Sequence, residues 1–483
     1  MRTTYTRFTN NSGTNVGYVG AASGGEDIFL TSNTSSPIFI YNNNDTLSGI
    51  TINSNGHVGI GTTKASCKLD VKGNVSGDFV DWYGVEWTDS QSDPPLIRIG
   101  NMSYHRSLPI QSGMKGYAIM QAVTTNGEMI LPLTDDWSKA KFATGDNGTT
   151  GIGDFTNTVV KIPEYWYIHE YDETTGTHQL KLSQTAKAGW LHHKEAYVGA
   201  YEGYNDGTYY RSVKGQVPTV SVNRETIRGL ARANGYEDES KWNIYTYEEH
   251  KAICHLFMVE YATRNSQAAV NTELTADGFK QGGLGSGCTP GSVTIGGATK
   301  YSFIPTGVTD SLGNGSGQVA YTVTQTDADG NETGTVTRYA NRYRGIENPF
   351  GHIWKHCDDV ISQYNSTSEF RTFYKCDKPE HFATNKNTKY KPVCSAPVAE
   401  GYKKTLKHTI GLDLFTYEVG RSASTYWCDY NYDNTDTAEH CLLIGGRSGH
   451  GATAGLFSLA SGAGVGYSHV SIGSRLTYLP WAE

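Results

Sequence analysis

The sequence predicts an α+β protein whose N-terminal segment is built from strands alone. Composition supports this: among 483 residues, 37% are hydrophobic, 18% are charged, 56 are glycine and 32 are tyrosine. Such a polar, weakly charged chain suits β-structure and long ordered loops better than a helical bundle. Short alternations of apolar and polar residues recur along the chain, and two later segments show helical periodicity.

Charge and hydropathy exclude several classes of function. The net charge of -8 disfavours nonspecific nucleic-acid binding. No run of about 18 apolar residues occurs, so we expect no membrane insertion, and the first residues lack the apolar core of a signal peptide. The eight cysteines form no C-x-x-C motif, which argues against a zinc ribbon, and we expect them to be mostly small buried residues.

The first 77 residues contain short β-prone pieces at roughly ten-residue spacing, separated by polar turns. Each piece has few apolar residues, so a single copy would bury too little surface to offset its ordering entropy. We therefore expect this segment to wrap with copies of itself into a symmetric, trimeric β-fibre. The predicted strands are Glu26–Leu30, Pro37–Tyr41, Gly49–Ile52, His57–Ile60 and Lys68–Val71.

A second domain is expected from about Asp78 to the end of the chain, because aromatic and apolar residues increase there. Val159–Tyr171 alternates like a strand, and Thr177–Ser183 could pair back on it. A helix is predicted over Asn223–Asn234, with Gly235 after its end. A second, amphipathic helix is predicted from the capping box that Thr246 forms with Glu249 to about Ala262.

Residues 281–340 are rich in glycine, serine and threonine and contain two alternating runs around Asp329-Gly330. This pattern predicts a hairpin inserted into the second domain. The tail Cys441–Pro480 places apolar residues between stretches of small or hydrogen-bonding ones. Its apolar positions are Leu442, Leu443, Ile444, Leu456, Phe457, Leu459, Ile472, Leu476 and Leu479.

Two segments resemble known families. NGHVGIGTTKASCKLDVKGNV, Asn55–Val75, resembles the shafts of phage tail fibres and adhesins. The C-terminal third contains three motifs, GIENPFGHIW, LLIGGxxxxGxxAGLF and SIGSRL. Together they resemble the variable proteins of diversity-generating retroelements, a family that includes the phage major tropism determinant. This second resemblance extends over roughly residues 80–480, because four upstream segments are also similar to the family. They are YGVEWTDSQSDPPLIRIGNMSYHRSLPIQS, KIPEYWY, AYVGAYEG and LFMVEYATRNSQ.

This second resemblance implies a C-type-lectin fold in which fixed scaffold positions alternate with diversified ones. The implied scaffold positions are Gly445, Gly446, Ala454, Gly455, Phe457, Ile472, Gly473, Arg475 and Leu476. Retroelement mutagenesis of Asn codons does not produce Met, Trp, Lys, Gln or Glu, and Arg447–Ser471 contains none of these, nor any Asn. A low-complexity loop that lacks them by chance is the alternative.

A surface that tolerates substitution cannot also supply the core, so the residues between the apolar positions should face outward. The implied ligand-binding residues are Arg447, Ser448, His450, Ala452, Thr453, Ser458, Ala460, Tyr467 and His469. Tyr426, Tyr430 and Tyr432 could add aromatic contact area, as in antibody loops, whereas Trp427 is expected in the core.

Three patterns contain residues that could hold a metal or take part in catalysis, but each favours a structural interpretation. His352, His356, Cys357, Asp358 and Asp359 could ligate a metal, but the neighbouring Pro-Phe-Gly turn and Trp354 favour a packed segment. Asp429, Asn431 and Asp433 have the spacing of a calcium loop, but Asn434 stands where such a loop has glycine and His440 where it has glutamate. His192-His193 reads as a strand or surface pair. We expect no catalytic residues, no metal and no cofactor, with calcium as the alternative.

The combined expectation is a phage tail-fibre receptor-binding protein, part of the virion and present in the host-cell cytoplasm during assembly. Its partners would be a bacterial surface receptor, either protein or glycan, and other tail proteins. The alternatives are a variable ligand-binding protein displayed on a bacterial surface and an enzyme of the formylglycine-generating type.

Overall fold

The computed structural model describes residues 5–9, 12–21, 28–32, 38–42, 45–52, 58–60, 69–71, 80–120, 128–137, 156–235, 239–301 and 303–482. The chain divides into two compact units, residues 1–77 (unit 1) and 78–483 (unit 2), at the position where the composition changes. Among the described residues, strands account for 41% and helices for 11%. The β-rich character predicted from the composition is therefore confirmed.

Unit 1 contains two small sheets. Its strands are β1 (Tyr5–Thr9), β2 (Asn15–Ala21), β3 (Ile28–Ser32), β4 (Ile38–Asn42), β5 (Asp45–Ile52), β6 (Val58–Ile60) and β7 (Leu69–Val71). The sheets have the orders β1-β2-β3 and β4-β5-β6-β7, and β6 pairs with β7 in parallel. Each of the five predicted strands overlaps an observed one, whereas β1 and β2 were not predicted. Of the shaft-like stretch, only β6 and β7 lie within the described residues, and Cys67 lies outside them.

Three sheets contain most of the strands in the described part of unit 2. Their strands are β8 (Tyr83–Thr88), β9 (Ile97–Gly100), β10 (Gly116–Met120), β11 (Met129–Pro132), β12 (Thr156–Ile162), β13 (Tyr165–Asp172), β14 (Thr177–Ser183), β15 (Leu191–His193), β16 (Ala196–Glu202), β19 (Trp242–Ile244), β25 (Trp354–Asn365), β26 (Phe370–Lys375), β27 (Lys391–Pro397), β28 (Gly401–Leu406), β29 (Thr416–Val419), β30 (Tyr430–Tyr432), β31 (Glu439–Ile444), β32 (Leu459–Gly464), β33 (Ile472–Gly473) and β34 (Arg475–Tyr478).

The six-stranded sheet has the order β11-β10-β12-β16-β34-β19, and the five-stranded sheet has the order β15-β13-β14-β8-β9. The nine-stranded sheet follows the order β27-β26-β25-β31-β32-β30-β28-β29, with β33 paired to β25. Smaller sheets join β17 (Tyr204–Asn205) to β18 (Tyr210–Arg211), β20 (Val293–Ile295) to β21 (Ala298–Lys300), and β22 (Gly317–Thr326) to β23 (Glu332–Tyr343) and β24 (Ile346–Glu347).

The α-helices of the described residues are α1 (Met102–Ser107), α2 (Arg224–Arg232) and α3 (Tyr247–Tyr261), so both predicted helices are confirmed. Thr246 caps α3 by accepting the N–H of Glu249 at 3.3 Å. Helix α3 is buried on all sides rather than amphipathic, because it packs against strands β8, β12 and β25 of three sheets. The Glu249 carboxylate does not return to the cap; it binds Nε2 of the buried His193 at 2.9 Å.

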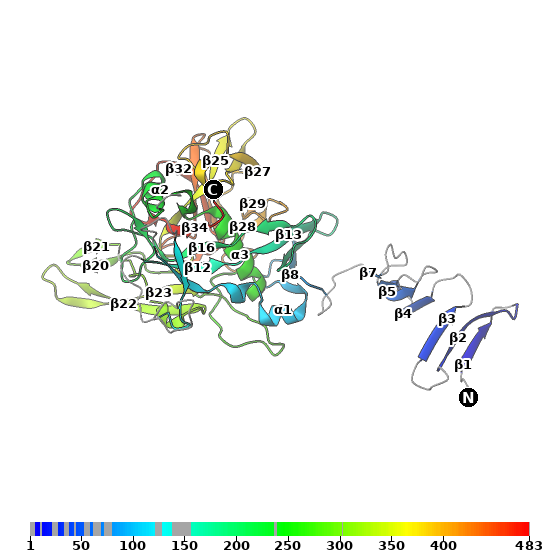
Figure 1. The fold of residues 1–483 in the computed structure, drawn as a ribbon. Helices are drawn as coiled ribbons and strands as arrows, with labels where there is room; N and C mark the ends of the chain where they lie inside the picture. The colour runs from blue at the N-terminus through cyan, green and yellow to red at the C-terminus, as the bar shows by residue number, and fades with distance from the viewer. Residues whose placement is uncertain are drawn as a thin grey trace. The chain divides into compact units, whose positions relative to one another are not determined.

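The hairpin predictions are confirmed in part. β13 pairs with β14 across the predicted turn, and β22 pairs with β23 around Asp329-Gly330, so that this arm extends from the body of unit 2 (Figure 1). The predicted single strand Val159–Tyr171 is wrong. It consists of β12 and β13 in different sheets, separated at Pro163, which has no N–H to continue a ladder.

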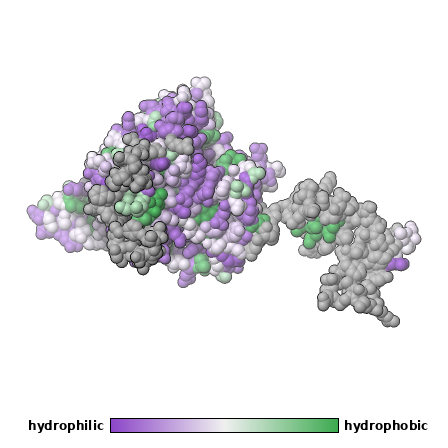
Figure 2. Space-filling model, viewed as in Figure 1, coloured by the Kyte–Doolittle hydropathy of each residue, from purple (hydrophilic) through white to green (hydrophobic). Residues whose placement is uncertain are grey.

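The face of unit 2 visible in Figure 2 is mainly hydrophilic, with apolar residues in small separate patches. The apolar residues predicted as packing positions in the tail are all buried. The described cysteines form no disulfide with one another. All are buried except Cys394, which is half-buried, so the prediction that the cysteines are mostly buried is confirmed for the described ones. Within the described ranges, the helices are too short or too polar to span a membrane.

Candidate ligand-binding groove

A cavity of about 510 Å³ opens beside the strands of the C-terminal segment. We call it the C-terminal groove. It is lined by Trp354, Glu400, Tyr432, Asp433, Asn434, Leu443, Arg447, His450, Ala460, Gly462, Ala463, Gly464, Tyr467, His469, Ser471 and Ile472. Six of the residues predicted to bind ligand are among them: Arg447, His450, Ala460, Tyr467, His469 and Tyr432.

The floor of the groove is apolar and comes from four strands. Trp354 of β25 pairs in parallel with Ile472 of β33, and Leu443 of β31 lies opposite Ala460 of β32. These four side chains form one cluster with Cys441 and are at most 8% exposed. Because the floor is held by ladder hydrogen bonds and close packing, it is a rigid base for the side chains around it.

A hydrogen-bonded chain fixes one wall. Arg447 Nε donates to His450 Nε2 at 2.9 Å, so the other ring nitrogen, Nδ1, carries the proton and donates to Tyr432 Oη at 3.2 Å. The Tyr432 hydroxyl donates to Thr453 Oγ1 at 2.7 Å, and Thr453 Oγ1 donates to the His450 carbonyl at 2.8 Å. Burial and the positive charge of Arg447 lower the pKa of His450 to about 4, so the ring is neutral at pH 7.

Another part of the lining is formed by Tyr467, which is 46% exposed. Its ring lies parallel to that of His469, with centroids 6.3 Å apart. His469 is held by Ser471 Oγ at 2.9 Å from Nδ1, and its carbonyl accepts the N–H of Ser221 at 3.0 Å. The exposed tyrosine is therefore attached to an anchored turn.

Polar side chains occupy a further part of the lining. The Asp433 carboxylate pairs with Nε of the fully buried Arg371 at 2.7 Å. Asn434 Nδ2 donates to the Gly462 carbonyl at 3.0 Å, which ties this loop to β32. Glu400 is exposed and has no ion-pair partner among the described residues. Among the described residues of this region, the Glu400 carboxylate is therefore free to bind a ligand, whereas Arg371 neutralises that of Asp433.

The remaining predicted residues divide by exposure. Ala452 is exposed and Thr453 half-buried, and both lie outside the groove lining although Thr453 bonds Tyr432. Tyr430 is half-buried, with its ring 4.6 Å from that of Tyr432 and 5.2 Å from that of Tyr402. Trp427 is 2% exposed and belongs to the core, as predicted.

The prediction that the nine tail side chains face outward is wrong for Ser448, Ser458 and Ala460, which are buried. Tyr426 is buried as well, so it offers little of the predicted aromatic contact area. Ser448 Oγ accepts a hydrogen bond from the fully buried Arg338 and donates one to the Pro290 carbonyl at 3.1 Å. Ser458 Oγ donates to the Tyr430 carbonyl at 2.9 Å. Both hydroxyls satisfy buried polar groups of neighbouring segments, which explains their burial.

Ala460 and Tyr426 are buried for different reasons. Ala460 stands within β32, between β31 and β30, so that only 8% of its surface remains at the groove floor. Tyr426 has a left-handed backbone with φ of 57° and donates its N–H to the Ser92 carbonyl at 2.6 Å. The guanidinium of Arg421 lies 5.5 Å from its ring centre.

Sequence reasoning missed several groove residues. The sequence indicates only a packing role for Trp354, and Glu400 and Asn434 form no motif of their own, yet all three line the groove. The pairing of β25 with β33 brings Trp354 beside Ile472, although 118 positions separate them. A long-range strand pairing of this kind leaves no local signal in the sequence.

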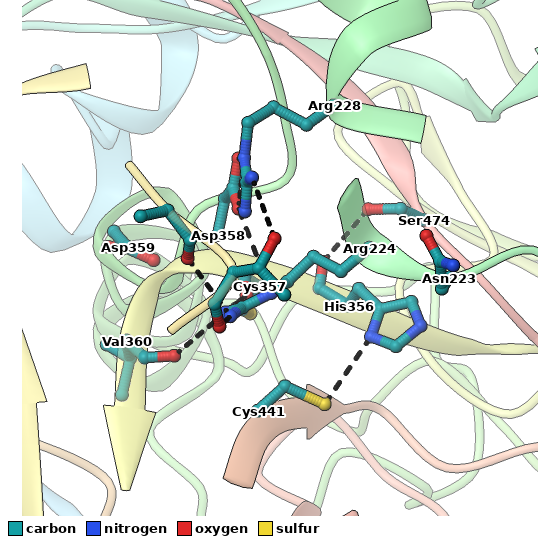
Figure 3. Close-up of polar contacts among 12 residues, drawn as sticks. Asn223, Arg224, Arg228, His356, Cys357, Asp358, Asp359, Val360, Cys441 and Ser474 are labelled. Atoms are coloured by element: carbon teal, nitrogen blue, oxygen red, sulfur yellow. Dashed lines mark hydrogen bonds and ion pairs between the residues drawn. The ribbon is translucent and has the colours of Figure 1, made fainter. Parts of the chain in front are cut away.

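The candidate metal residues of β25 are each engaged with other groups, and Figure 3 shows the contacts of His356, Cys357 and Asp358. His356 Nδ1 lies 3.6 Å from Cys441 Sγ, and Asp358 pairs with Arg228 at 2.5 Å. Asp359 accepts the N–H groups of Tyr247 and Glu248 at the start of α3, at 2.6 and 3.0 Å.

Next to this strand, Nδ1 of His352 binds the buried Glu202, and Nε2 accepts the N–H of Ile304 at 3.0 Å. The Cys357 carbonyl accepts a hydrogen bond from Arg224 at 3.2 Å. Among the described residues, no three His, Cys, Asp or Glu side chains gather in a way that could hold a metal ion.

The three residues with calcium-loop spacing also have separate partners. Asp429 Oδ2 accepts the N–H of Phe457 at 2.7 Å, and Asn431 donates to the Ala399 carbonyl at 2.6 Å. Asp433 pairs with Arg371. Their side chains therefore serve the scaffold beneath the groove. His192-His193 is the strand pair predicted, since both residues belong to β15.

No protein-family model matches the chain, and no curated protein matches it.

Proposed function

We propose that this protein is a phage tail-fibre receptor-binding protein that recognises a bacterial surface ligand through the C-terminal groove. The observation that carries the proposal is that residues implied to be diversified lie around the same groove. Residues that the retroelement resemblance marks as diversified, among them Arg447, His450, Tyr467 and His469, line one groove over a rigid apolar floor. A fixed frame with exchangeable side chains around a cavity is what a variable adhesin requires.

The scaffold side of the pattern supports the same proposal. All nine positions that the resemblance marks as fixed are buried. Arg475 illustrates their role, because its guanidinium donates to the carbonyls of Gly199 at 2.7 Å and Asn348 at 3.1 Å. We propose that unit 2 has a C-type-lectin-like fold and that retroelement mutagenesis diversifies its groove.

The protonation states of Cys441 and His356, a thiol–imidazole pair near the groove, favour binding over catalysis. Burial raises the pKa of Cys441 to about 11 and lowers that of His356 to about 3. Both groups are therefore neutral at pH 7, whereas a nucleophilic cysteine needs its thiolate. The pair supports a packing role.

For unit 1 we propose trimerisation and attachment to other tail proteins, which would place the protein in the virion. Ile50 and Ile60 lie opposite each other on β5 and β6 and are 39% and 40% exposed. A second and third copy would cover such an apolar pair. Three grooves on one particle would also strengthen weak individual contacts.

Flow cytometry of the labelled full-length protein over a panel of bacterial isolates tests the adhesin proposal. We expect binding to a subset of isolates, and Tyr467→Ala to weaken it about tenfold because its exposed ring is lost from the groove. Tyr417→Ala is the matched control, since Tyr417 is 40% exposed and outside the groove. Equal binding by the two variants, or binding to no isolate, would count against the proposal.

Sequencing of the flanking DNA tests the diversification separately. We expect a reverse-transcriptase gene and a template repeat that differs from the 3′ end of this gene at adenines only. A flank with neither would leave the groove as a fixed binding site.

A further inference from the structure

The shape of the diversified face restricts what it can bind. Of the nine diversified tail positions, Ser448, Ser458 and Ala460 expose at most 8% of their surface. Four of the other six, Arg447, His450, Tyr467 and His469, line a cavity of about 510 Å³, within the usual range for small-ligand pockets, roughly 300–1,000 Å³. A protein partner typically needs a broader contact of about 800 Å² on each side. The hollowed face therefore favours a compact ligand.

Aromatic rings line this groove and continue beyond it. Tyr467 presents 46% of its side chain, and Tyr432 packs edge-on against Trp354 at 5.6 Å. From Tyr432 the row continues to Tyr430 at 4.6 Å and then to Tyr402 at 5.2 Å. Aromatic faces pack well against the C–H faces of pyranose rings, and a row of them suits a chain of such rings.

The charges of the groove nearly balance. Arg447 contributes a positive charge and Glu400 a negative one. The carboxylate of Asp433 is neutralised by Arg371 at 2.7 Å, and the low pKa of His450 keeps that ring uncharged. A polyanion would require an excess of cations, and a cationic ligand an excess of carboxylates. The balance favours a neutral ligand.

Polar groups surround the apolar floor. Arg447 uses Nε and Nη1 for His450 and Tyr301, and its Nη2 has no hydrogen-bond partner in the described part of the chain. The Tyr467 hydroxyl and the Glu400 carboxylate are likewise available to a ligand. Donors and acceptors around an apolar centre match the hydroxyl rim and apolar face of a sugar.

From these features we infer that the ligand of the C-terminal groove is a neutral oligosaccharide, an inference that rests on the proposed function. Tyr467 stacks on one sugar ring, and Arg447 and Glu400 bind hydroxyls. The aromatic row from Tyr432 to Tyr402 extends the site for further rings.

An array of neutral bacterial oligosaccharides probed with the full-length protein tests this directly. We expect binding to a subset of glycans, an affinity about tenfold weaker for Tyr467→Ala, and one within about threefold of wild type for Tyr467→Phe, which keeps the ring. The control Tyr417→Ala should bind like wild type. Binding to no neutral glycan, or binding unaffected by Tyr467→Ala, would overturn the inference.

Treated cells separate this inference from the proposed function. On isolates that the protein binds, mild periodate oxidation of the surface glycans should abolish binding, and protease treatment should not. The reverse result would overturn the oligosaccharide ligand but leave the adhesin proposal standing. Array binding without binding to any isolate would retain the ligand class and count against the adhesin proposal.

Discussion

Gly455, one of the nine scaffold positions, is packed closely against the side chain of Asp429. A Cβ atom at this position would lie 2.0 Å from Oδ1 of Asp429, a buried residue that holds the N–H of Phe457 at 2.7 Å. Gly455→Ala must displace that carboxylate or the loop. We expect the free energy of unfolding to fall by about 1–3 kcal/mol, measured by urea denaturation.

Gly464 is the matched control, because it lies in the same segment and a Cβ atom there would have no neighbour within 4 Å. Gly464→Ala should leave the free energy of unfolding within about 0.5 kcal/mol of wild type. Equal stability of the two variants would contradict the packing argument for Gly455.

His450 provides a test of the groove's electrostatics. Burial is the main cause of its low pKa of about 4, and Arg447 is the second. Because this value lies below the ordinary 6.5, the stabilising contribution of the neutral ring is complete above pH 6.5 and is lost as the pH falls towards 4. Arg447→Met removes the neighbouring charge, so the pKa of His450 should rise.

NMR titration of the His450 ring measures this directly, with Tyr417→Ala as a control that should leave the value unchanged. If the ring titrates near 6.5 in wild type, or if Arg447→Met lowers its pKa, the assigned hydrogen-bond chain from Arg447 to Thr453 is wrong.

At this scale the sequence identifies which tail residues pack, because the apolar positions Leu443 and Ile472 stand out from small neighbours. It does not identify which hydroxyls are buried. Ser448 is enclosed by Arg338, 110 positions away, and Ser458 by the carbonyl of Tyr430. Those contacts depend on how the inserted region and β30 pack against the tail, which no local pattern encodes.

Helix α3 shows how an element is fixed from two sides. Thr246 caps it locally, and Asp359 of β25 accepts the N–H groups of Tyr247 and Glu248. Thr246→Ala should reduce the free energy of unfolding by about 1 kcal/mol. Asp359→Asn should reduce it more, by about 1–3 kcal/mol, because the amide turns an N–H group towards a buried N–H donor.

Chemical denaturation measures both effects. Asp377→Asn is the control, since the Asp377 side chain is 81% exposed. If the Asp359 and Asp377 variants lose equal stability, the second cap contributes nothing.

The T-x-x-E motif predicts where α3 begins, but not that β25 supplies a second cap or that sheets enclose the helix. The same limit explains the error at Pro163. Alternation predicts extended chain on both sides of it, and only the sheet partners separate β12 from β13. Helix α1, with six residues, is too short to produce a periodic signal.

At the scale of the whole molecule, unit 1 leaves apolar side chains exposed in a single chain. Its described strands are short, and the facing residues Ile50 and Ile60 remain 39% and 40% exposed in a single chain. A small strand-only unit gains stability by burying such pairs between copies. We therefore expect a stable trimer with a mass three times that of the 52.8 kDa chain.

Light scattering coupled to size exclusion distinguishes the possibilities, because the trimer depends on apolar contacts between copies. Replacing both Ile50 and Ile60 by serine removes that contact from each copy and should shift the full-length protein towards monomer. Ile410→Ser is the matched control, because Ile410 lies in unit 2 and is 52% exposed. A wild-type monomer at micromolar concentration would contradict the fibre, and a double variant that stays trimeric would place its contacts elsewhere in unit 1 or in unit 2. Three linked copies of a binding site attach to a repetitive surface far more tightly than one copy does. We therefore expect dissociation of the trimer also to weaken cell binding without changing the affinity of each groove.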